Sequence, residues 1–510
     1  MLSIKELKVP LIVALAQLAV HLVFHANYGY FRDELYYIAC SDHLDFGYVD
    51  QPPLSIAVLA ANRALLGDSL FALRLLPALS SALVVMLGAL MARALGGSRF
   101  SQGFAAVTVA SAHVLVGVGR FYSMNAFDVL FWALASYTII IILNTGDAKR
   151  WILFGAIVGL GLLNKFSIGF LCIGLAGGLL LTRHRKHLAT RWFWFGAALA
   201  GVIFLPHLIW QMEHGFPTLE FMRNATQQKN ISHTPLEFLL GQFRDVNFFN
   251  APVWLAGLFY FFFHRNCNRT FGWMYVVIFI IMVAQNAKVY YLSPVYPLLL
   301  AGGSLLAEEA GQGRYRILVR RLYPALVVIW AMLVLPFSVP VLPVEQFIAY
   351  QRWLGLAPRA EERASLGDLP QYYADQFGWE EMVRTVADIY AGLPPEEKKE
   401  CVLYARNYGE AAAIDLFGKQ YGLPKALCAH NSYWYWGPGD KSGNVAIIFG
   451  GRRDLQENLD DLKRVFTNVQ LVGTTQCRYC MPFENNRQIF LCRGINTTIQ
   501  KLWPSERFYI

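Results

Sequence analysis

The sequence is poor in charged residues. Asp, Glu, Lys and Arg make up 15% of its 510 residues, whereas hydrophobic residues make up 55%. Soluble domains carry about 25% charged residues. From Pro10 to Pro340 the apolar residues form long runs, each close to the roughly 20 residues that cross a bilayer, and from Val344 onward the composition is that of a soluble protein. The sequence therefore excludes an ordinary soluble protein and predicts two domains, a membrane domain at 1–343 and a soluble domain at 344–510.

The sequence also lacks the marks of several other protein classes. It has no tail rich in Lys and Arg, no stripe of alternating aromatic and basic residues, no internal repeat and no low-complexity linker. Its net charge of +9 comes from basic residues in short loops between apolar runs, where such residues set membrane orientation. No nucleic-acid partner is therefore expected. No small-residue cleavage site follows the first apolar run, Pro10–Phe24, so we expect this run to be retained as a membrane anchor.

The eight cysteines have no zinc-site spacing. Cys477 and Cys480 form a CxxC, but no second pair and no nearby His accompany it, which leaves a disulfide or free thiols open. In an oxidising compartment, Cys480 with Cys492 and Cys401 with Cys428 are further possible pairs.

About eleven apolar segments are predicted to cross the membrane as helices. They are residues 9–26, 70–92, 101–118, 126–143, 151–164, 167–182, 192–211, 248–264, 271–286, 289–307 and 322–341. The first outside loop, 27–69, contains an amphipathic stretch at 52–67, which we expect to lie in the membrane interface as a helix.

Every second loop is basic, and the positive-inside rule places these loops in the cytoplasm. With an odd number of spans, the N-terminus then lies in the cytoplasm and the C-terminal domain lies outside. The basic residues are Lys5, Lys8, Arg93, Arg99, Lys149, Arg150, Arg183, Arg185, Lys186, Arg191, Arg265, Arg269, Arg314, Arg316, Arg320 and Arg321.

The C-terminal part mixes strand-like and helical patterns. The runs 401–405, 445–449 and 488–492 predict strands, and the runs 409–422 and 454–466 predict helices, which together indicate an α/β domain. The aromatic segment HNSYWYWGPGD (430–440) is predicted to be a loop. Its rings either stack on a sugar or pack the domain on the membrane, and the second interpretation is favoured.

The segment YGYFRDELYYI follows the first apolar run and places the acid pair Asp33-Glu34 beside Arg32, Tyr36 and Tyr37. On a helix, Asp33 shares a face with the two tyrosines, whereas Glu34 points elsewhere. Ionisable residues held at a membrane are functional candidates because they are costly there. The alternative is an aromatic belt at the interface with a solvated salt bridge.

Further polar residues lie in other loops on the side predicted to be outside. Each has a structural alternative, because lysines can snorkel, an acid can cap a helix and tyrosines can form a belt. Their occurrence on one side of the membrane favours a common site. The set is Asp50, Gln51, Arg120, Asn125, Asp128, Lys165, Lys288, Tyr290 and Tyr291.

These motifs resemble those of GT-C glycosyltransferases of family 39, the superfamily of protein O-mannosyltransferases and aminoarabinose transferases. The matching features are the DE pair after the first span, the QPPL turn, the Asp at the start of the fourth span and the KVYYLSP segment. The segments NYGEAAAIDLFG and HNSYWYWGPG resemble those of a bacterial subgroup of family 39-like proteins. The resemblance implies a polytopic α-helical GT-C membrane domain followed by an extracytoplasmic α/β domain.

The resemblance also implies an inverting glycosyltransferase of the bacterial cytoplasmic (inner) membrane. Such enzymes move a monosaccharide from a polyprenyl-phosphate carrier to a periplasmic acceptor, here a glycan, a lipid or a protein, and lipopolysaccharide modification is one such process. A phosphate leaving group needs little protonation, so one base suffices. We expect Asp33 to be this base and Lys288, Lys165 and then Arg120 to stabilise the released phosphate. Asp128 is expected to position the acceptor or sugar, and Glu34 is included as a catalytic candidate.

Two departures from the family pattern concern Asp50 and Gln51. Gln51 stands where aminoarabinose transferases have a Lys, so one phosphate contact is missing or is supplied elsewhere. Asp50 stands where those enzymes have a Glu that can bind metal, but no matching His cluster accompanies it. The sequence therefore predicts no cofactor and no required divalent metal.

Two rival functions remain open. A transporter or flippase of lipid-linked sugars would also be a polytopic bundle with interior charges, but it would place charges within the spans and often shows repeats. A membrane-anchored binding protein would depend on residues after about 344 and would not need Asp33.

Overall fold

The computed structural model describes residues 7–265, 268–358, 362–451 and 455–510, so the predicted basic residue Lys5 lies outside the described residues. The chain forms two compact units. Unit 1 comprises the chain up to Asn27, Pro52–Trp210 and Ser232–Pro343, and unit 2 comprises Tyr28–Gln51, Gln211–Ile231 and Val344–Ile510. The last segment of unit 2 starts at Val344, the residue at which the predicted soluble domain begins. The structure differs from the predicted division in two segments, 28–51 and 211–231, which lie in unit 2.

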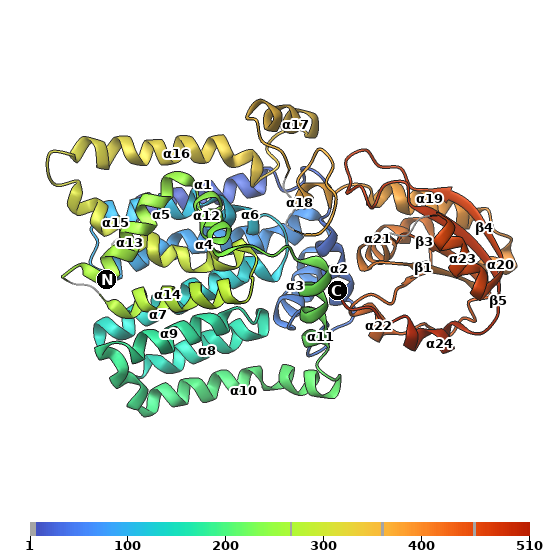
Figure 1. The fold of residues 1–510 in the computed structure, drawn as a ribbon, viewed down its shortest axis with the longest axis horizontal. Helices are drawn as coiled ribbons and strands as arrows, with labels where there is room; N and C mark the ends of the chain where they lie inside the picture. Colours follow the sequence, from blue (N-terminus) through green and yellow to red (C-terminus); the bar gives the residue numbers. More distant parts are fainter. Residues whose placement is uncertain (1–6, 266–267, 359–361, 452–454) are drawn as a thin grey trace. The chain divides into compact units, whose positions relative to one another are not determined.

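Unit 1 is built from helices (Figure 1). They are α1 (Lys8–Val23), α3 (Leu54–Leu66), α4 (Leu70–Ala94), α5 (Arg99–Ala110), α6 (His113–Val118), α7 (Met124–Thr145), α8 (Arg150–Asn164), α9 (Ile168–Leu180), η1 (Arg183–Ala189), α10 (Arg191–Glu213, whose last turn enters unit 2), α12 (Pro235–Asp245), η3 (Phe248–Asn250), α13 (Ala251–Phe263), α14 (Arg269–Ala284), η4 (Val289–Val295), α15 (Tyr296–Ala310), η5 (Leu318–Leu322), α16 (Tyr323–Val334) and η6 (Leu335–Phe337).

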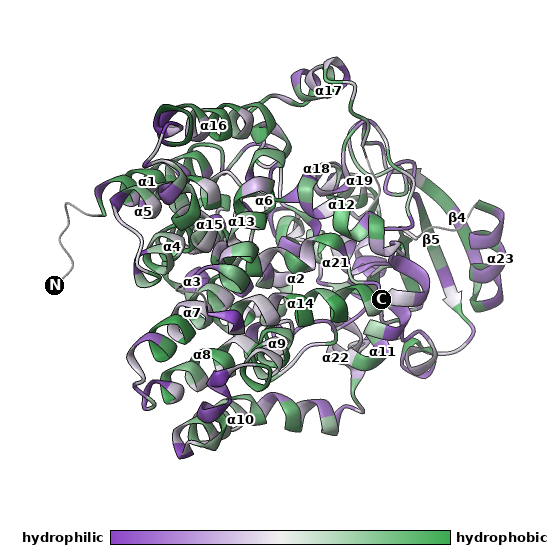
Figure 2. Cartoon of the chain, turned by 60° about the vertical axis from the view of Figure 1, so that its left-hand side comes forward, coloured by the Kyte–Doolittle hydropathy of each residue, from purple (hydrophilic) through white to green (hydrophobic). Residues whose placement is uncertain are grey.

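Each apolar segment that the sequence predicted to cross the membrane is helical over most of its length, although 101–118 is divided between α5 and α6. Among the described residues, five helices are long and apolar enough to span a bilayer, and the bent pair Pro235–Asp245 with Phe248–Phe263 makes up to six. Five more apolar helices are shorter, and α1 and the predicted interfacial helix α3 are among them. Figure 2 colours most of the helices of unit 1 as hydrophobic. The structure therefore confirms a polytopic helical architecture, while the number of crossings near eleven and their orientation stay predictions.

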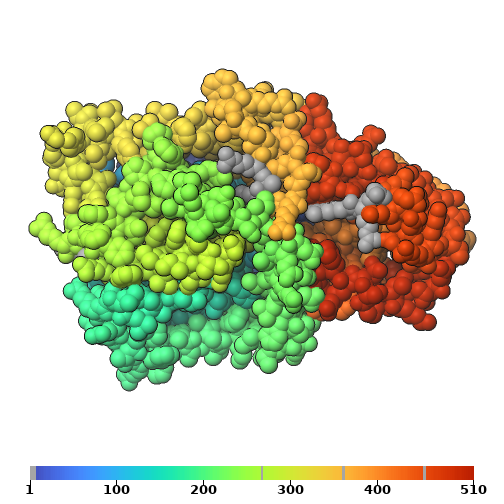
Figure 3. Space-filling model, in the orientation of Figure 1, coloured from blue at the N-terminus to red at the C-terminus, as the bar shows by residue number. Residues whose placement is uncertain are grey.

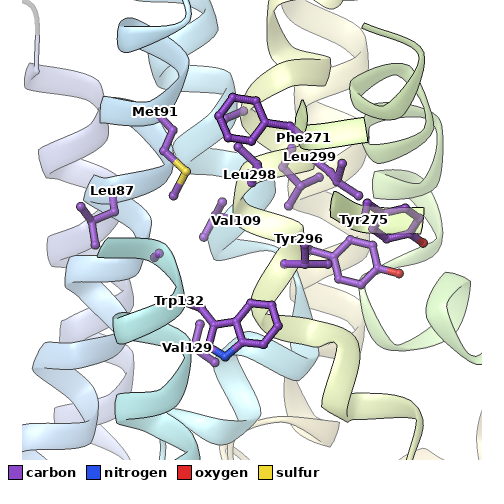
Figure 4. Close-up of a cluster of buried hydrophobic side chains, with 14 of the residues drawn as sticks. Leu87, Met91, Val109, Val129, Trp132, Phe271, Tyr275, Tyr296, Leu298 and Leu299 are labelled. Carbon is purple, nitrogen blue, oxygen red and sulfur yellow. The ribbon is translucent and has the colours of Figure 1, made fainter. Parts of the chain in front are cut away.

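The core of unit 1 is formed by apolar side chains from several of its helices, including Met91 of α4, Trp132 of α7 and Leu299 of α15 (Figure 4). Glycine allows α13 and α15 to pack backbone against backbone. A Cβ at Gly303 would lie 1.8 Å from the carbonyl oxygen of Val253. Small residues at such contacts let membrane helices approach closely.

Unit 2 combines short helices with one mixed sheet. Its helices are α2 (Arg32–Ser41), α11 (Pro217–Asn224), η2 (Ala225–Lys229), α17 (Val344–Trp353), α18 (Gln371–Ala374), α19 (Trp379–Ala391), α20 (Pro395–Glu400), α21 (Tyr408–Phe417), η7 (Gly418–Tyr421), α22 (Tyr433–Trp436), α23 (Leu455–Val465), α24 (Ile499–Leu502) and η8 (Trp503–Ser505). Its strands are β1 (Cys401–Ala405), β2 (Ala426–Leu427), β3 (Val445–Phe449), β4 (Phe466–Thr474) and β5 (Gln488–Ile495).

The strand order is β2-β1-β3-β5-β4. β1 pairs with β2 and β3 in parallel, and β5 pairs with β3 and β4 antiparallel. All five residues of β3 are buried, which suits the central strand of a sheet covered on both faces. β1, β3, β5, α21 and α23 lie where the sequence predicted strands and helices, whereas β4 was not predicted. Nearly all of its residues are at least partly exposed, so it lacks the apolar run that marked the other strands.

The aromatic segment 430–440 was predicted to be a loop, but Tyr433–Trp436 forms the short helix α22. Its rings are occupied by contacts inside unit 2. The hydroxyl of Tyr433 donates to Asp415 at 2.8 Å, Trp434 exchanges two hydrogen bonds with Trp503, and Trp436 stacks on His43 at 4.1 Å. These contacts give the rings a packing role within unit 2.

The structure contains none of the possible disulfides. Cys401, Cys428, Cys477, Cys480 and Cys492 are all free thiols, and all of them except Cys477 are buried.

Candidate active site

The first group, which we call the acid cluster, consists of the predicted residues Asp33, Tyr36 and Asp50 together with Tyr408, all in unit 2. The hydroxyl of Tyr408 donates to Oδ1 of Asp33 at 3.0 Å, and the hydroxyl of Tyr36 donates to Oδ1 of Asp50 at 3.0 Å. The two tyrosine rings lie 4.6 Å apart. Each carboxylate therefore accepts a hydrogen bond from one tyrosine hydroxyl, and the rings of the two tyrosines contact each other.

The helices α2 and α21 create this arrangement by packing against each other. Asn407 caps α21 by accepting from the backbone N–H of Glu410 at 3.0 Å, and this places Tyr408 at the first helical position. Gly409 follows, and a Cβ at this position would lie 2.6 Å from Cγ of Arg32. A glycine is thus needed where α21 meets the start of α2.

Arg32 is buried beside Asp33 and forms an ion pair with Asp375. Its Nη2 lies 3.4 Å from Oδ2 of Asp375, and its Nε lies 3.9 Å from Oδ1 of Asp33. The backbone N–H of Arg32 also donates to the carbonyl of Asp375 at 3.0 Å. A buried charge needs such a partner because it has left water. Asp33 itself remains accessible, with 39% of its side chain exposed.

Burial sets the protonation of the groups around Asp33. It raises the pKa of Asp50 to about 6, although the hydrogen bond from Tyr36 works in the opposite direction. Burial also raises the pKa of Asp375 to about 7 against the influence of Arg32. The pKa values of the Tyr36 and Tyr408 hydroxyls rise well above their usual range, mainly through burial. Both tyrosines therefore stay protonated and act as hydrogen-bond donors.

Gln51 and Tyr37 are also buried in unit 2. Gln51 is 1% exposed, and among the described residues its side-chain amide lies beside the thiol of Cys40. Tyr37, expected to share the face of Asp33, is 4% exposed within the unit 2 core.

Glu34 has a structural position. It is fully buried, and its Oε2 accepts from the backbone N–H of Phe31 at 3.0 Å, within the capping arrangement that starts α2. We therefore assign Glu34 to fixing the start of the helix that carries Asp33, and we leave it out of the proposed chemistry.

The second group, which we call the lysine cluster, lies in unit 1 and contains Asn125, Asp128, Lys165, Tyr290 and Tyr291. The ammonium of Lys165 donates to Oδ1 of Asn125 at 2.7 Å and lies 3.7 Å from Oδ2 of Asp128. It also lies 4.7 Å from the centre of the Tyr291 ring and 5.8 Å from that of Tyr290. The other oxygen of Asp128 accepts from Ser167 at 2.5 Å. Residues from α7, from the end of α8 and from η4 thus converge on one cation.

Arg120 and Lys288 are placed differently within unit 1. Arg120 is buried and its Nη1 donates to the carbonyl of Ser338 at 3.5 Å, next to η6. Lys288 is half-buried and directly precedes η4, the segment that carries Tyr290 and Tyr291.

Within the described ranges, no three or more His, Cys, Asp and Glu side chains form a group that could hold a metal ion. Asp50 has Asp33 as an acidic neighbour that raises its pKa, but no His approaches this pair closely enough to complete such a group. The metal-independence expected from the sequence stays a prediction.

Sequence reasoning missed Tyr408, which belongs to the acid cluster, and Asp375, which forms an ion pair with the neighbouring Arg32. Tyr408 lies in the NYGEAAAIDLFG segment, which carried part of the family resemblance. That motif could have marked Tyr408 as a candidate site residue. Asp375 lies in ADQFG, a short polar stretch without a motif. Only the folded chain brings it to Arg32.

Comparisons with known proteins agree with these motifs. The family model described as dolichyl-phosphate-mannose-protein mannosyltransferase matches residues 50–210. The lipid A galacturonosyltransferase RgtD from Rhizobium johnstonii is 27% identical over 232 residues, which cover 44% of this chain and 48% of that protein. The alignment thus spans about half the length of this curated relative.

The fold matches solved structures over nearly the whole chain. ArnT from Cupriavidus metallidurans bound to undecaprenyl phosphate superposes with a TM-score of 0.61 at 14% identity, covering 94% of this chain and 97% of ArnT. The apo state of ArnT gives the same TM-score at 13% identity. The family-model match, the relative and the shared fold confirm the resemblance to GT-C glycosyltransferases.

Proposed function

We propose that this protein is an inverting glycosyltransferase that moves a monosaccharide from a polyprenyl-phosphate carrier to an acceptor hydroxyl outside the cytoplasm. The observation that carries the proposal is the accessible carboxylate of Asp33, held by Tyr408 and flanked by Arg32. A carboxylate that is both fixed and reachable is what a general base requires.

In the proposed reaction, Asp33 takes the proton of the acceptor hydroxyl while the acceptor oxygen attacks the anomeric carbon. The bond between the anomeric carbon and the phosphate oxygen breaks, and its electron pair stays on the polyprenyl phosphate. Attack from the face opposite the leaving group inverts the configuration. The leaving phosphate needs no acid, so a single carboxylate base balances the reaction.

The lysine cluster of unit 1 is the group that the sequence motifs predict to bind the carrier phosphate. Lys165 lies against two tyrosine rings and a carboxylate that fix its ammonium. Fixed cations that meet developing negative charge stabilise the transition state without reorganising. Asp128 and Asn125 position this lysine, and Lys288 and Arg120 are further candidates for the carrier phosphate.

Asp50 and Gln51 are assigned to sugar or acceptor recognition. With a pKa of about 6, Asp50 is ionised at neutral pH and can accept hydrogen bonds from hydroxyl groups. Gln51 offers an amide that has both donor and acceptor atoms. Two polar side chains in sequence, one charged and one neutral, suit the hydroxyl pattern of a sugar.

The acceptor and the donor are proposed from the comparisons. RgtD is described by its name as acting on lipid A, and the ArnT structure holds undecaprenyl phosphate. We accordingly favour an envelope lipid such as lipid A as acceptor and a polyprenyl-phosphate monosaccharide as donor. The inner bacterial membrane, with the N-terminus in the cytoplasm and unit 2 in the periplasm, is the proposed location.

A flippase of lipid-linked sugars is the alternative, because a polytopic bundle with buried charges also suits transport. The experiment uses the purified protein in lipid nanodiscs and in vesicles, with a panel of polyprenyl-phosphate monosaccharides and an envelope-lipid extract. Acceptor-dependent release of polyprenyl phosphate in nanodiscs supports the transferase. Movement of the intact donor across vesicles, without release from any donor, would contradict it. A parallel reaction with EDTA tests the expected independence of divalent metal.

A further inference from the structure

The loop that joins β4 to β5, residues 475–487, carries two thiols that the proposed reaction does not use. Cys477 and Cys480 are separated in the sequence by Arg478 and Tyr479. The backbone N–H of Cys480 donates to Sγ of Cys477 at 3.1 Å, and Sγ of Cys480 donates to the carbonyl of Cys477 at 3.5 Å. The two side chains also hydrogen-bond to each other. The thiols are therefore in contact within one short bend of the chain.

Hydrogen bonds that involve neither sulfur atom hold this loop. At its ends, the backbone N–H of Thr475 donates to the carbonyl of Arg487 at 2.8 Å, and the backbone N–H of Arg487 donates to the hydroxyl of Thr475 at 2.9 Å. Within it, the backbone N–H of Cys477 donates to Oδ1 of Asn485 at 2.9 Å. A chemical change at the sulfur atoms leaves these bonds in place, so the loop can present the pair in either redox state.

The pair packs on the turn that begins α19. Gly378, with φ of +92°, precedes this helix, and a Cβ there would lie 3.0 Å from Sγ of Cys477 and 3.4 Å from Cβ of Cys480. The ring of Tyr479 lies 5.8 Å from that of Phe377, centre to centre. Figure 3 shows red and orange segments of this kind side by side at the surface of unit 2. The thiols thus lie against a glycine, which leaves room at the sulfur atoms.

The two thiols differ in access and in protonation. Cys477 is half-buried, whereas Cys480 is buried. The hydrogen bond with the Cys480 side chain lowers the pKa of Cys477, although the carboxylate of Glu381 acts in the opposite direction. The same contact, together with burial, raises the pKa of Cys480. An accessible thiol with a lowered pKa beside a buried one is the arrangement of an attacking and a resolving cysteine.

Two other thiols of the sheet lack these features. Burial raises the pKa of Cys401 in β1 to about 11 and that of Cys492 in β5 to about 12. Both side chains are buried, and a buried thiol that keeps its proton acts as a small packing group. Cys401 and Cys492 therefore provide an internal standard for the reactivity of Cys477.

We propose that Cys477 and Cys480 form a reversible dithiol–disulfide site, at which Cys477 attacks a partner disulfide and Cys480 then closes a disulfide within the loop. In the first step the Cys477 thiolate bonds to one partner sulfur, the partner S–S bond breaks and one partner thiolate leaves. In the second step Cys480 loses its proton, attacks Sγ of Cys477 and displaces the other partner thiolate. The two cysteines give up two electrons and two protons, and the partner disulfide becomes two thiols. The inference is independent of the proposed transferase, because no residue of the acid cluster or the lysine cluster takes part.

Brief alkylation tests the reactivity of Cys477. The reduced full-length protein in phosphatidylcholine nanodiscs is exposed to limiting iodoacetamide, and the labelling of each cysteine is measured by peptide mass spectrometry. The thiolate fraction falls about tenfold for each unit by which a pKa exceeds the pH, so Cys477 is expected to react at least about tenfold faster than Cys401 and Cys492. Labelling of Cys477 at the rate of the two buried thiols would overturn the proposal.

Oxidation tests the disulfide itself. Trypsin cleaves after Arg464, Arg478 and Arg487, so the two cysteines fall on separate peptides, 465–478 and 479–487. After the folded protein is treated with a disulfide and digested without reductant, these peptides are expected to be joined. Dithiothreitol added to the folded protein before digestion is expected to separate them again. A link that dithiothreitol releases only after unfolding would contradict the reversible site.

Two oxidants distinguish the kind of partner. Glutathione disulfide represents a small disulfide, and an oxidised CxxC oxidoreductase represents a protein disulfide. Joined peptides after glutathione disulfide support a site open to small partners, and joined peptides after the oxidoreductase alone support a site that requires a protein partner. Peptides that stay separate with both oxidants would overturn the proposal.

A set of variants tests the two roles. With glutathione disulfide, Cys480→Ala is expected to accumulate the mixed disulfide on Cys477, because the resolving thiol is gone. Cys477→Ala is expected to leave Cys480 unmodified, and the control Cys492→Ala should give the joined peptides of the parent. An equally fast adduct on Cys480 in Cys477→Ala would contradict the assigned roles. Should the variants fail to fold, the alkylation rates of the unmodified protein decide the question.

Discussion

The hydroxyl of Tyr408 lies 3.0 Å from Oδ1 of Asp33, although 375 positions separate the two residues in the sequence. A tyrosine from the soluble half of the chain thus orients the carboxylate that follows the first apolar helix. Because burial raises the pKa of Tyr408 well above its usual range, this hydroxyl keeps its proton and remains a donor. The contact links α21 to the proposed base.

Removing this hydroxyl tests its role. Tyr408→Phe keeps the ring that packs on Tyr36 and loses the hydrogen bond to Asp33. Hydrogen bonds to charged groups contribute about 1.5–3 kcal/mol, so we expect kcat to fall about tenfold to a hundredfold with little change in the donor KM. Steady-state kinetics measures both. Tyr421→Phe, at an exposed tyrosine of unit 2, is the control, and a Tyr408→Phe enzyme with full kcat would contradict the role.

The pH dependence should report Asp50. Burial raises its pKa to about 6, so its carboxyl group gains a proton as the pH falls through 6 and loses its capacity to accept hydrogen bonds from hydroxyls. We expect kcat/KM to decline below about pH 6, and we expect Asp50→Asn to remove this limb while lowering the plateau. Asp388→Asn, at an exposed position on α19, should retain the limb.

The raised pKa of Asp50 affects the stability of the fold in the opposite direction to its effect on activity. The folded state holds the proton of Asp50 more tightly than the unfolded state, so its stabilising effect is present at acidic pH and is lost as the pH rises through about 6. At pH 8 Asp50→Asn should therefore be at least as stable as the parent in thermal unfolding, although it is less active. Marked destabilisation of this variant at pH 8 would contradict the burial account.

The sequence predicted the helical segments, three of the five strands and the members of the lysine cluster. Long apolar runs such as 126–143 define helices without tertiary information, and Asp128, Lys165 and Tyr291 could be grouped because topology put their loops on one side. Asp375 could not be found in this way. Its contact with Arg32 depends on folding of unit 2, and no local pattern encodes it.

The sequence also could not predict that residues 28–51 and 211–231 belong to unit 2. Hydropathy separates apolar from polar segments, but it does not tell which polar loops pack together. The role of Glu34 was hidden for a similar reason, because a carboxylate that caps a helix and one that handles protons look alike in a motif.

Gly409 offers a test of the packing that positions Arg32. A Cβ there would lie 2.6 Å from Cγ and 3.0 Å from Cδ of Arg32, so Gly409→Ala must displace the arginine or the helix. Overpacking of this kind costs about 1–3 kcal/mol, and we expect a lower Tm together with a lower kcat. Gly392→Ala is the control, since its nearest contact, 3.5 Å from the carbonyl oxygen of Ile389, is an ordinary one. Equal effects of the two substitutions would contradict the tight contact.

The lysine cluster is tested by Lys165→Met, which keeps the length of the side chain and removes the charge. Loss of one group that stabilises transition-state charge typically costs about 10²–10³ in kcat, and we expect a fall of this size. Release of polyprenyl phosphate under single-turnover conditions measures it. Lys186→Met, at an exposed lysine of η1, serves as the control. A loss confined to the donor KM would restrict Lys165 to ground-state binding.

The central claim is that Asp33 is the base, and single-turnover release of polyprenyl phosphate by Asp33→Asn in nanodiscs with donor and acceptor tests it most directly. The substitution keeps the shape and the hydrogen bond from Tyr408 and removes the proton acceptor. The account predicts a rate at least about a hundredfold lower than that of the parent, the scale expected for a lost general base, with Asp388→Asn unchanged. Release by Asp33→Asn at the parent rate would contradict the account and move the base to Asp50 or Asp128.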